Sequence, residues 1–335
     1  MKPDTSPTIK DVARVAGVSL ATVSKVINNL PVGEKSRVKV EEAIKTLGYE
    51  ANTFARALKS SKTYTVALVL PSLKHPFFAH LTDELTKSLM RRGYRALLMI
   101  TNYDPMAEEK CFAMVRSNKA DGAIALTYSP DLTVSGKMPL VTIDRHLGDD
   151  VPCISSDNYR GGELAAKKLI GLGCRSLLHL RVTSGVPGEP DKRGAGFEFK
   201  CAAAGVPCRT IILSDRESDL PLFRFVEEHI CNGQPEYDGI FCGSDLLACQ
   251  ILRFLHEHGV SVPEQVQIIG YDGIPDRMTG SVSCSTIEQP IAHMAEASVD
   301  LILNFNNTSV GANICLPVKY VPGGTTRDEP QASTE

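Results

Sequence analysis

Polar residues end several apolar runs of this chain, at positions where parallel sheets commonly carry binding groups. These runs resemble buried strands, and the carboxyl ends of such strands meet at one edge of a sheet, where ligands bind. The residues at these ends therefore indicate a polar ligand-binding cleft. They are Asn102 after ALLMI, Thr127 after GAIAL, Asp144-Arg145 after LVTI, Ser244-Asp245 after GIFCG, and Asp272 after IIGY.

None of the polar residues forms a recognisable catalytic, phosphate-binding or metal-binding motif. Gly194-Ala195-Gly196 lacks a third glycine and follows no strand, and neither GxxxxGK nor GxSxG occurs. The ten cysteines form no CxxC, and the pairs Cys201/Cys208 and Cys242/Cys249 match no zinc spacing. The sequence therefore predicts a binding cleft in a protein that is not an enzyme, with structural thiols, no metal and no cofactor.

The elements that would position this cleft alternate between strand-like and helix-like stretches from Tyr64 onwards. This alternation predicts parallel sheets with right-handed crossovers. Eight or more such units exceed what one compact sheet needs, so we expect two doubly wound α/β subdomains facing a cleft. The strand-like runs are 65–70, 96–100, 122–126, 140–143, 176–180, 209–213, 237–241 and 266–270.

The first fifty residues predict a small all-α unit. Thr8 and Asp11 form a capping box before a helix at 9–16, and Ser19 caps a second helix at 20–28. A third helix is expected from about Lys35 to Leu47, with Gly48 just past its end. Two short helices joined by a tight glycine turn, the second with exposed polar groups, are typical of a helix-turn-helix.

The net charge of −3 over 335 residues is distributed unevenly. Residues 1–62 hold eleven Lys/Arg against six Asp/Glu, a net charge of +5, while the remaining residues carry −8. A basic head on an acidic body indicates that the head binds a polyanion. The first residues, MKPDTSPTIKD, contain no apolar segment, and no apolar run reaches the roughly 18 residues of a membrane span. We therefore expect a soluble cytoplasmic protein.

The segment TIKDVARVAGVSLATVSKVINN (8–29) resembles the lactose/galactose-repressor (LacI/GalR) family. The similarity continues in order through YEANTFARALKS, HPFFAHL, LVTIDR, SSDNYRGGELAAKKLI, RGAGF, GIFCGSDLLACQIL, VPEQVQIIGYDGI and STIEQPI. The resemblance implies a transcriptional repressor that binds a palindromic operator as a homodimer. It also implies a small effector, usually a sugar or a nucleobase, bound between two subdomains of the periplasmic-binding-protein type.

The resemblance also implies domain boundaries: a headpiece at 1–50, a hinge helix at 51–62, and a disordered tail at 331–335. The N-terminal subdomain would comprise 63–156 and 288–317, and the C-terminal subdomain 157–287 and 318–330. Because the chain has no terminal leucine heptad, a dimer is expected rather than a tetramer.

In the headpiece, the recognition helix would present Leu20, Ala21 and Lys25 to base edges, with Lys25 donating to guanine. Thr8, Ser19, Thr22 and Asn28 would contact phosphates. Thr8 and Ser19 could instead serve only as helix caps, and Leu20 could pack in the core.

In the hinge, Leu58 matches the family's intercalating residue, with Ala55 and Arg56 in the minor groove. The alternative is that Phe54 and Leu58 dock the linker onto the body.

The effector cleft is expected to be lined by nine residues with the polar and aromatic groups that suit a polyhydroxylated ligand. For Arg193 and Asp272 the alternative is a salt bridge between the subdomains, and for Asp157 it is capping of the helix that follows. The nine residues are Phe77, Phe78, Asn102, Asp144, Asp157, Arg193, Ser244, Asp272 and Gln289.

Several residues depart from the family pattern and leave the effector open. His75 and Ser244 stand where Asn is common, Gly323 replaces the usual Arg of the closing block, and the chain has no Trp. Whether the effector induces or corepresses is equally open. Two other classes are less consistent with the sequence: a transport-type sugar-binding protein, which would lack the basic head, and an enzyme using Asp144, His146 or Arg193, which no spacing supports.

Overall fold

The structure is a computed structural model that describes residues 7–27, 30–49, 62–117, 119–129, 138–183, 185–214, 220–232, 235–274, 284–305 and 312–328. The chain divides into two compact units, residues 1–63 and 64–335. The predicted tail lies outside the described residues. So do the predicted hinge, apart from Lys62, and the DNA contacts proposed for Asn28, Ala55, Arg56 and Leu58.

The first unit contains the three predicted helices, α1 (Ile9–Ala16), α2 (Leu20–Ile27) and α3 (Glu34–Leu47). Gly17 and Gly48 follow α1 and α3 with φ of 62° and 58°, a left-handed conformation that favours glycine. Val12, Val23 and Val40, one from each helix, are fully buried in a common core. The predicted helix-turn-helix is confirmed.

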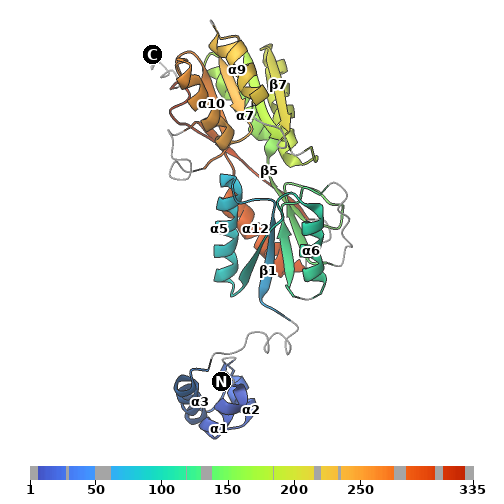
Figure 1. Cartoon of the computed structure of the whole chain (residues 1–335), viewed down its shortest axis with the longest axis vertical. Helices are drawn as coiled ribbons and strands as arrows, with labels where there is room; N and C mark the ends of the chain where they lie inside the picture. Colours follow the sequence, from blue (N-terminus) through green and yellow to red (C-terminus); the bar gives the residue numbers. More distant parts are fainter. Residues whose placement is uncertain are drawn as a thin grey trace, which may run out of the picture. The chain divides into compact units, whose positions relative to one another are not determined.

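The second unit contains two six-stranded sheets, which define its two lobes (Figure 1). The N-terminal lobe has the all-parallel order β11-β5-β4-β3-β1-β2. Its strands are β1 (Thr65–Leu70), β2 (Arg95–Ile100), β3 (Gly122–Ala125), β4 (Leu140–Ile143), β5 (Cys153–Ser156) and β11 (Asn313–Leu316).

The C-terminal lobe has the order β12-β10-β9-β8-β6-β7, parallel except for the antiparallel pair β10–β12. Its strands are β6 (Leu177–Thr183), β7 (Cys208–Ser214), β8 (Gly239–Cys242), β9 (Gln267–Asp272), β10 (Thr286–Glu288) and β12 (Lys319–Val321). The two doubly wound subdomains expected from the sequence are confirmed.

Side-chain alternation along the strands explains why helices cover both faces of each sheet. In β1, Leu68 packs with α5 (Pro76–Arg91) and α12 (Ile291–Leu303), whereas Val69 packs with α6 (Pro105–Arg116) on the opposite face (Figure 1). In β8, Phe241 packs with α7 (Asn158–Gly171) and α8 (Lys192–Ala204). Its neighbour Cys242 faces α9 (Leu220–Val226), a π-helical turn (Glu227–Cys231) and α10 (Asp245–Glu257).

The chain crosses between the lobes three times: after β5, between β10 and α12, and between β11 and β12. The crossing at 288–291 comes just after Glu288, the last residue of β10, whereas the predicted boundary placed residue 288 in the N-terminal lobe. The sequence did not predict the four short strands next to these crossings, β5, β10, β11 and β12.

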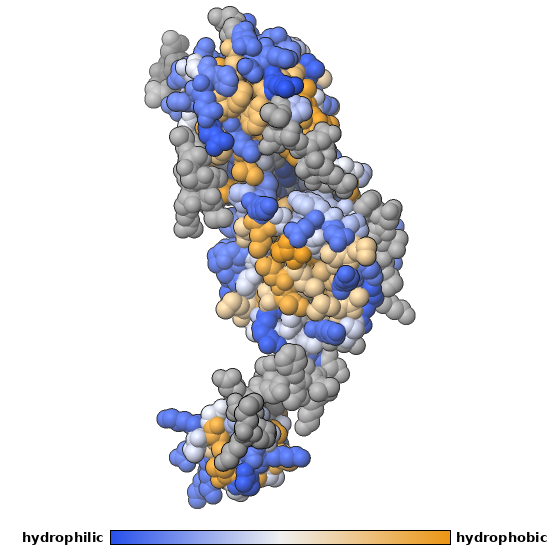
Figure 2. All heavy atoms as spheres, viewed as in Figure 1, coloured by the Kyte–Doolittle hydropathy of each residue, from blue (hydrophilic) through white to orange (hydrophobic). Residues whose placement is uncertain are grey.

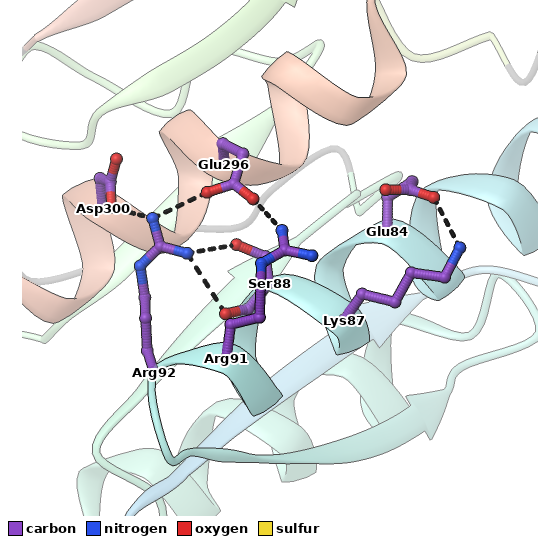
Figure 3. A network of polar contacts seen from close by, with 7 residues as sticks. All are labelled: Glu84, Lys87, Ser88, Arg91, Arg92, Glu296 and Asp300. Carbon is purple, nitrogen blue, oxygen red and sulfur yellow. Dashed lines mark hydrogen bonds and ion pairs between the residues drawn. The ribbon is translucent and has the colours of Figure 1, made fainter.

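An ion-pair network on the surface joins α5 to α12 (Figure 3). The Arg92 guanidinium donates to Glu296 at 2.7 Å, to Asp300 at 2.6 Å and to the Ser88 hydroxyl at 2.8 Å, and Arg91 also pairs with Glu296. The network lies on the same side of the sheet as the core between α5 and α12. It therefore links α12 to the C-terminal end of α5 on the outer surface of the helix layer.

Candidate functional site

A cavity of about 210 Å³ lies at the carboxyl ends of strands from both lobes. Ligand sites for drug-sized molecules are usually larger, from about 300 Å³, so this cavity suits a compact ligand. Its walls combine aromatic rings, guanidinium groups and carboxylates. The residues most relevant to chemistry are His75, Phe77, Phe78, Tyr103, Thr127, Tyr128, Asp144, Arg145, His179, Arg181, Thr183, Asp191, Arg193, Ser244 and Asp272.

Arg193, in the first turn of α8, is the central cation of this wall and is 8% exposed. Its Nε donates to Asn158 Oδ1 at 2.7 Å, and one Nη donates to the Gly243 carbonyl at 2.6 Å. The guanidinium carbon lies 3.6 Å from the centroid of the Tyr271 ring, a cation–π contact. All these partners belong to the C-terminal lobe, so the structure holds Arg193 by hydrogen bonds and a ring rather than by the interlobe salt bridge weighed above.

Asp144 and Asp272 bring buried carboxyl groups to the cavity, one from each lobe. Asp144 Oδ1 and Asp272 Oδ2 are buried without a hydrogen-bond partner among the described residues. Burial raises the pKa of Asp144 to about 6 despite the opposing effect of Arg193. Burial likewise raises the pKa of Asp272 well above its usual value. Both residues have positive φ, 59° and 122°, so the backbone itself is strained where each strand ends.

The N-termini of α5 and α10 lie at the cavity, and each is capped by a cavity-lining residue that departs from the family pattern. His75 caps α5, its Nδ1 accepting from the Phe77 amide at 3.3 Å, and Ser244 caps α10, accepting from the Leu247 amide at 3.2 Å. Burial, aided by the charge of Arg193, lowers the pKa of His75 to about 4, so its ring is neutral at physiological pH. Helix N-termini carry partial positive charge, which favours negative charge in the cavity.

Six of the nine predicted effector contacts line the cavity: Phe77, Phe78, Asp144, Arg193, Ser244 and Asp272. The other three lie elsewhere. Asn102 is exposed and has a φ of 50°, and the next residue, Tyr103, takes its place in the wall. Asp157 caps α7 by accepting from the Arg160 amide at 3.0 Å, as the alternative proposed.

Gln289 lies behind the cavity wall. Its amide donates to Asp272 Oδ1 at 2.8 Å, and its carbonyl accepts from the Ser156 hydroxyl at 2.7 Å. Gln289 therefore orients the Asp272 carboxyl group and bridges residues of both lobes without lining the cavity.

Strand β6 supplies cavity residues that the sequence analysis missed: His179, Arg181 and Thr183. They occupy alternate positions of LLHLRVT, between apolar neighbours. This two-residue spacing places all three on one face of the strand. The polar alternation was the available signal, because Leu178 and Leu180, which alternate with these residues, mark the apolar face of the strand.

A short segment of the C-terminal lobe closes one side of the cavity against the N-terminal lobe. The Glu189 amide donates to the Asp144 carbonyl at 2.8 Å. The Glu189 carboxylate, 7% exposed, lies 2.8 Å from His146 Nε2 and 2.6 Å from Lys192 Nζ. These contacts join β4 of one lobe to the start of α8 in the other.

In the headpiece, the cap residues and the exposed face of α2 are distinct. The Asp11 carboxylate accepts from the Thr8 amide and hydroxyl at 3.0 and 2.7 Å, and these bonds lower the pKa of Asp11 to about 2. The Ser19 hydroxyl accepts from the Thr22 amide at 3.2 Å. Both capping roles are therefore present.

On α2, Leu20, Ala21 and Lys25 are exposed, on the side away from buried Val23 and Val26. Leu20 is 45% exposed, which excludes the core position weighed for it. The three residues proposed to face base edges thus share one accessible surface.

Among the described residues, no group of three or more His, Cys, Asp or Glu side chains is arranged to hold a metal ion. The described helices also include none with the length and apolar character needed to cross a bilayer.

Family models match nearly the whole chain. Residues 8–52 match the model of bacterial regulatory proteins of the lacI family. Residues 63–321 match the model of periplasmic binding proteins and the sugar binding domain of the LacI family.

Curated relatives and solved structures agree with this match. The chain is 31% identical to a sucrose operon repressor of Pediococcus pentosaceus, over 95% of this chain and 99% of the relative. It is 33% identical to a ribose operon repressor of Bacillus subtilis, over 96% and 99%. A lac repressor dimer bound to operator and the anti-inducer ONPF superposes with a TM-score of 0.80 at 21% identity, covering 96% and 99%. A periplasmic binding protein/LacI transcriptional regulator from Alkaliphilus metalliredigens QYMF, complexed with D-xylulofuranose, superposes with a TM-score of 0.69 at 28% identity, covering 79% and 100%.

Proposed function

The chain belongs to the LacI family of bacterial regulatory proteins, and on that premise we propose that it represses transcription under the control of a carbohydrate bound in the cavity between its two lobes. It is a DNA-binding regulator and not an enzyme. We place its action in the cytoplasm, where operator DNA lies.

One observation carries the carbohydrate assignment: three buried acceptor atoms on cavity-lining residues lack a partner among the described residues. They are Asp144 Oδ1, Asp272 Oδ2 and His179 Nε2. The Thr210 hydroxyl donates to Glu198 and lies 3.4 Å from His179 Nδ1, so Nδ1 carries the proton and Nε2 is an acceptor. Buried acceptors require donors. A ligand with several hydroxyl groups supplies them, and Phe77 and Phe78 offer rings to its C–H face.

The relatives support the same class of ligand, because those described above are named for the sucrose and ribose operons and one solved neighbour holds D-xylulofuranose. The headpiece supports DNA reading, since exposed Leu20, Ala21 and Lys25 lie on one side of α2 and α2 follows the tight turn at Gly17.

We assign operator binding to a homodimer, because a palindromic site requires two recognition helices. Exposed apolar side chains on the N-terminal lobe suit a second copy: Leu98 and Ile100 on β2, the free edge of the sheet, with Met90 at 68% and Met106 at 69% exposure on α5 and α6. Figure 2 shows an apolar area on this lobe. The effector would act by shifting the population of two lobe arrangements that hold the headpieces differently.

The test is selection of DNA from a randomised duplex pool with the purified full-length chain, followed by a salt series on the selected sequence. We expect a palindromic site whose affinity falls steeply with salt. For each tenfold rise in salt concentration, log K should decline by about 0.9 per phosphate contact. The variant Arg253→Ala, which removes an exposed surface cation of α10 in the C-terminal lobe, is the control and should bind normally. Recovery of no preferred sequence would refute the repressor assignment.

A further inference from the structure

The cavity wall formed by β6 contains a guanidinium whose counter-ion belongs to the chain itself. The Arg181 side chain is 14% exposed and pairs with Asp191, whose side chain is 38% exposed. The other oxygen of Asp191 accepts from the Gly188 amide at 3.0 Å. Asp191 thus places a carboxylate beside a mostly buried cation at the rim of a ligand cavity, and it is itself accessible enough to turn toward solvent.

Burial affects the acidic and basic groups of the cavity wall differently. Three guanidinium groups line it, from Arg145, Arg181 and Arg193, and an Arg side chain stays protonated in proteins. The carboxyl groups facing them are Asp144, Asp191 and Asp272. Asp272 is 2% exposed, and burial raises its pKa well above its usual value, which disfavours its charged form. Burial therefore weakens the negative charge of the wall, while its guanidinium groups stay charged.

The helix termini around the cavity contribute positive partial charge. The N-termini of α5 and α10 are directed at it through His75 and Ser244, and their dipoles favour an anion. The His179 ring is fully buried and stacks on Phe241 with ring centroids 5.0 Å apart. Burial, together with the charges of Arg181 and Arg193, lowers the pKa of His179 to about 3. The His179 ring is therefore neutral and adds no charge of its own.

We propose that the effector is an anionic sugar, bearing a carboxylate or a phosphate, and that its anionic group binds Arg181 in place of Asp191. This inference rests on the carbohydrate function proposed above and specifies which sugars are recognised. The hydroxyl groups meet the unpartnered acceptors of Asp144, Asp272 and His179, while the anion pairs with the Arg181 guanidinium. Asp191 is the internal counter-ion of the unliganded protein and is released when the ligand binds.

The experiment measures binding to the full-length protein by thermal shift and calorimetry with matched sugars. The panel pairs D-glucose with D-glucuronate, D-gluconate and D-glucose 6-phosphate, and D-ribose with D-ribose 5-phosphate. We expect at least one anionic member to bind at least tenfold more tightly than its neutral parent. The carboxylate and phosphate arms then identify which anion the site prefers.

If Arg181 binds the anionic group, substitutions at Arg181 and at Asp191 should change the affinity for the anionic sugar in opposite directions. Arg181→Gln should weaken the anionic sugar by 10- to 100-fold and leave the neutral parent nearly unchanged, and Arg181→Lys should restore part of the difference. Asp191→Asn should strengthen the anionic sugar, because the competing carboxylate is gone. Arg253→Gln, at a side chain 77% exposed on α10 and outside the cavity lining, is the control and should have no effect.

Each remaining outcome overturns the inference in a distinguishable way. If neutral sugars bind as tightly as their anionic partners, or Arg181→Gln weakens both equally while its melting temperature is unchanged, the anion assignment fails and the carbohydrate function stands. If no sugar of either kind binds, the carbohydrate function fails with it.

Discussion

Individual carboxyl groups in this protein differ in protonation because their surroundings differ. Asp11, on the surface, is held ionised by hydrogen bonds from Thr8, whereas Asp144 and Asp272 at the cavity are pushed toward the neutral form by burial. Near neutral pH the ionised carboxylate of Asp144 is therefore unfavourable in the unliganded cavity. Ligand hydroxyl groups that donate to these oxygens relieve that penalty.

The pKa of Asp144 predicts a specific dependence of stability on pH. Its value rises from 3.8 to about 6 on folding, so the folded state binds this proton more tightly than the unfolded chain. The stability that results is fully present below pH 4 and is lost as pH rises through 6. We expect Asp144→Asn to raise the free energy of unfolding at pH 7 by about 1–3 kcal/mol, with no gain at pH 4.

Urea unfolding at both pH values measures this change. Asp149→Asn, at an exposed position in the following loop, is the control and should have little effect at either pH. An equal gain at pH 4 and pH 7 would show that packing, not charge, is responsible.

Lys25 is the residue of the headpiece that we expect to read a base rather than a phosphate. Lys25→Ala should reduce affinity for the selected operator by roughly 10- to 100-fold and relax the preference at one position of each half-site, since a good base contact discriminates by about 1–3 kcal/mol. Binding to a matched set of single-base operator variants measures this. A uniform loss across all the sequences would instead make Lys25 a phosphate contact.

At the scale of elements, the site depends on how closely α7 and α8 approach. A Cβ at Gly162 would lie 1.9 Å from the Arg193 carbonyl oxygen, and a Cβ at Gly196 would lie 2.0 Å from the Tyr159 carbonyl oxygen. Two helix backbones therefore meet at two glycines, and this contact brings Asn158 of α7 within hydrogen-bond distance of Arg193. The geometry of the central cation is a consequence of helix packing.

Gly162→Ala should consequently affect both stability and the cavity. We expect a loss of about 3 kcal/mol or more, because neither backbone can move without disrupting the helix pair, together with weaker sugar binding. Gly171→Ala, in the last turn of the same helix with open space around its Cβ, is the matched control and should stabilise by up to about 1 kcal/mol. Thermal unfolding of the two variants measures the difference in stability. Equal melting temperatures would contradict the packing argument.

The same elements show what the sequence could predict. TVALVL is a run of buried β-formers, and the structure has β1 at those six residues. CISS is short and half polar, so β5 exists because its neighbours β4 and β11 pair with it, not because of local preference. Asp144 and Asp272 were identifiable as strand ends. Tyr103 was not, because two successive left-handed residues, Asn102 and Tyr103, set which side chain enters the wall.

At the scale of the whole molecule, function requires that effector binding in the cavity and operator binding by the headpiece are thermodynamically coupled. The backbone bond between Glu189 and Asp144 and the Gln289 bridge between Ser156 and Asp272 connect the two lobes around the cavity. A ligand that changes the arrangement of the two lobes therefore changes the Glu189–Asp144 bond and the Gln289 bridge together. The hinge, at residues outside the described structure, is where the family resemblance places the next link to DNA.

Thermodynamic linkage makes this coupling testable without knowing whether the effector induces or corepresses. The factor by which saturating effector changes operator affinity must equal the factor by which saturating operator changes effector affinity, and we expect about 5- to 150-fold. Fluorescence titrations in both directions measure the two factors. Leu58→Gly should abolish specific operator binding and leave the effector affinity of the free protein unchanged, so that operator DNA no longer alters effector binding. If operator affinity is retained in this variant, Leu58 does not intercalate and the coupling reaches DNA by another residue.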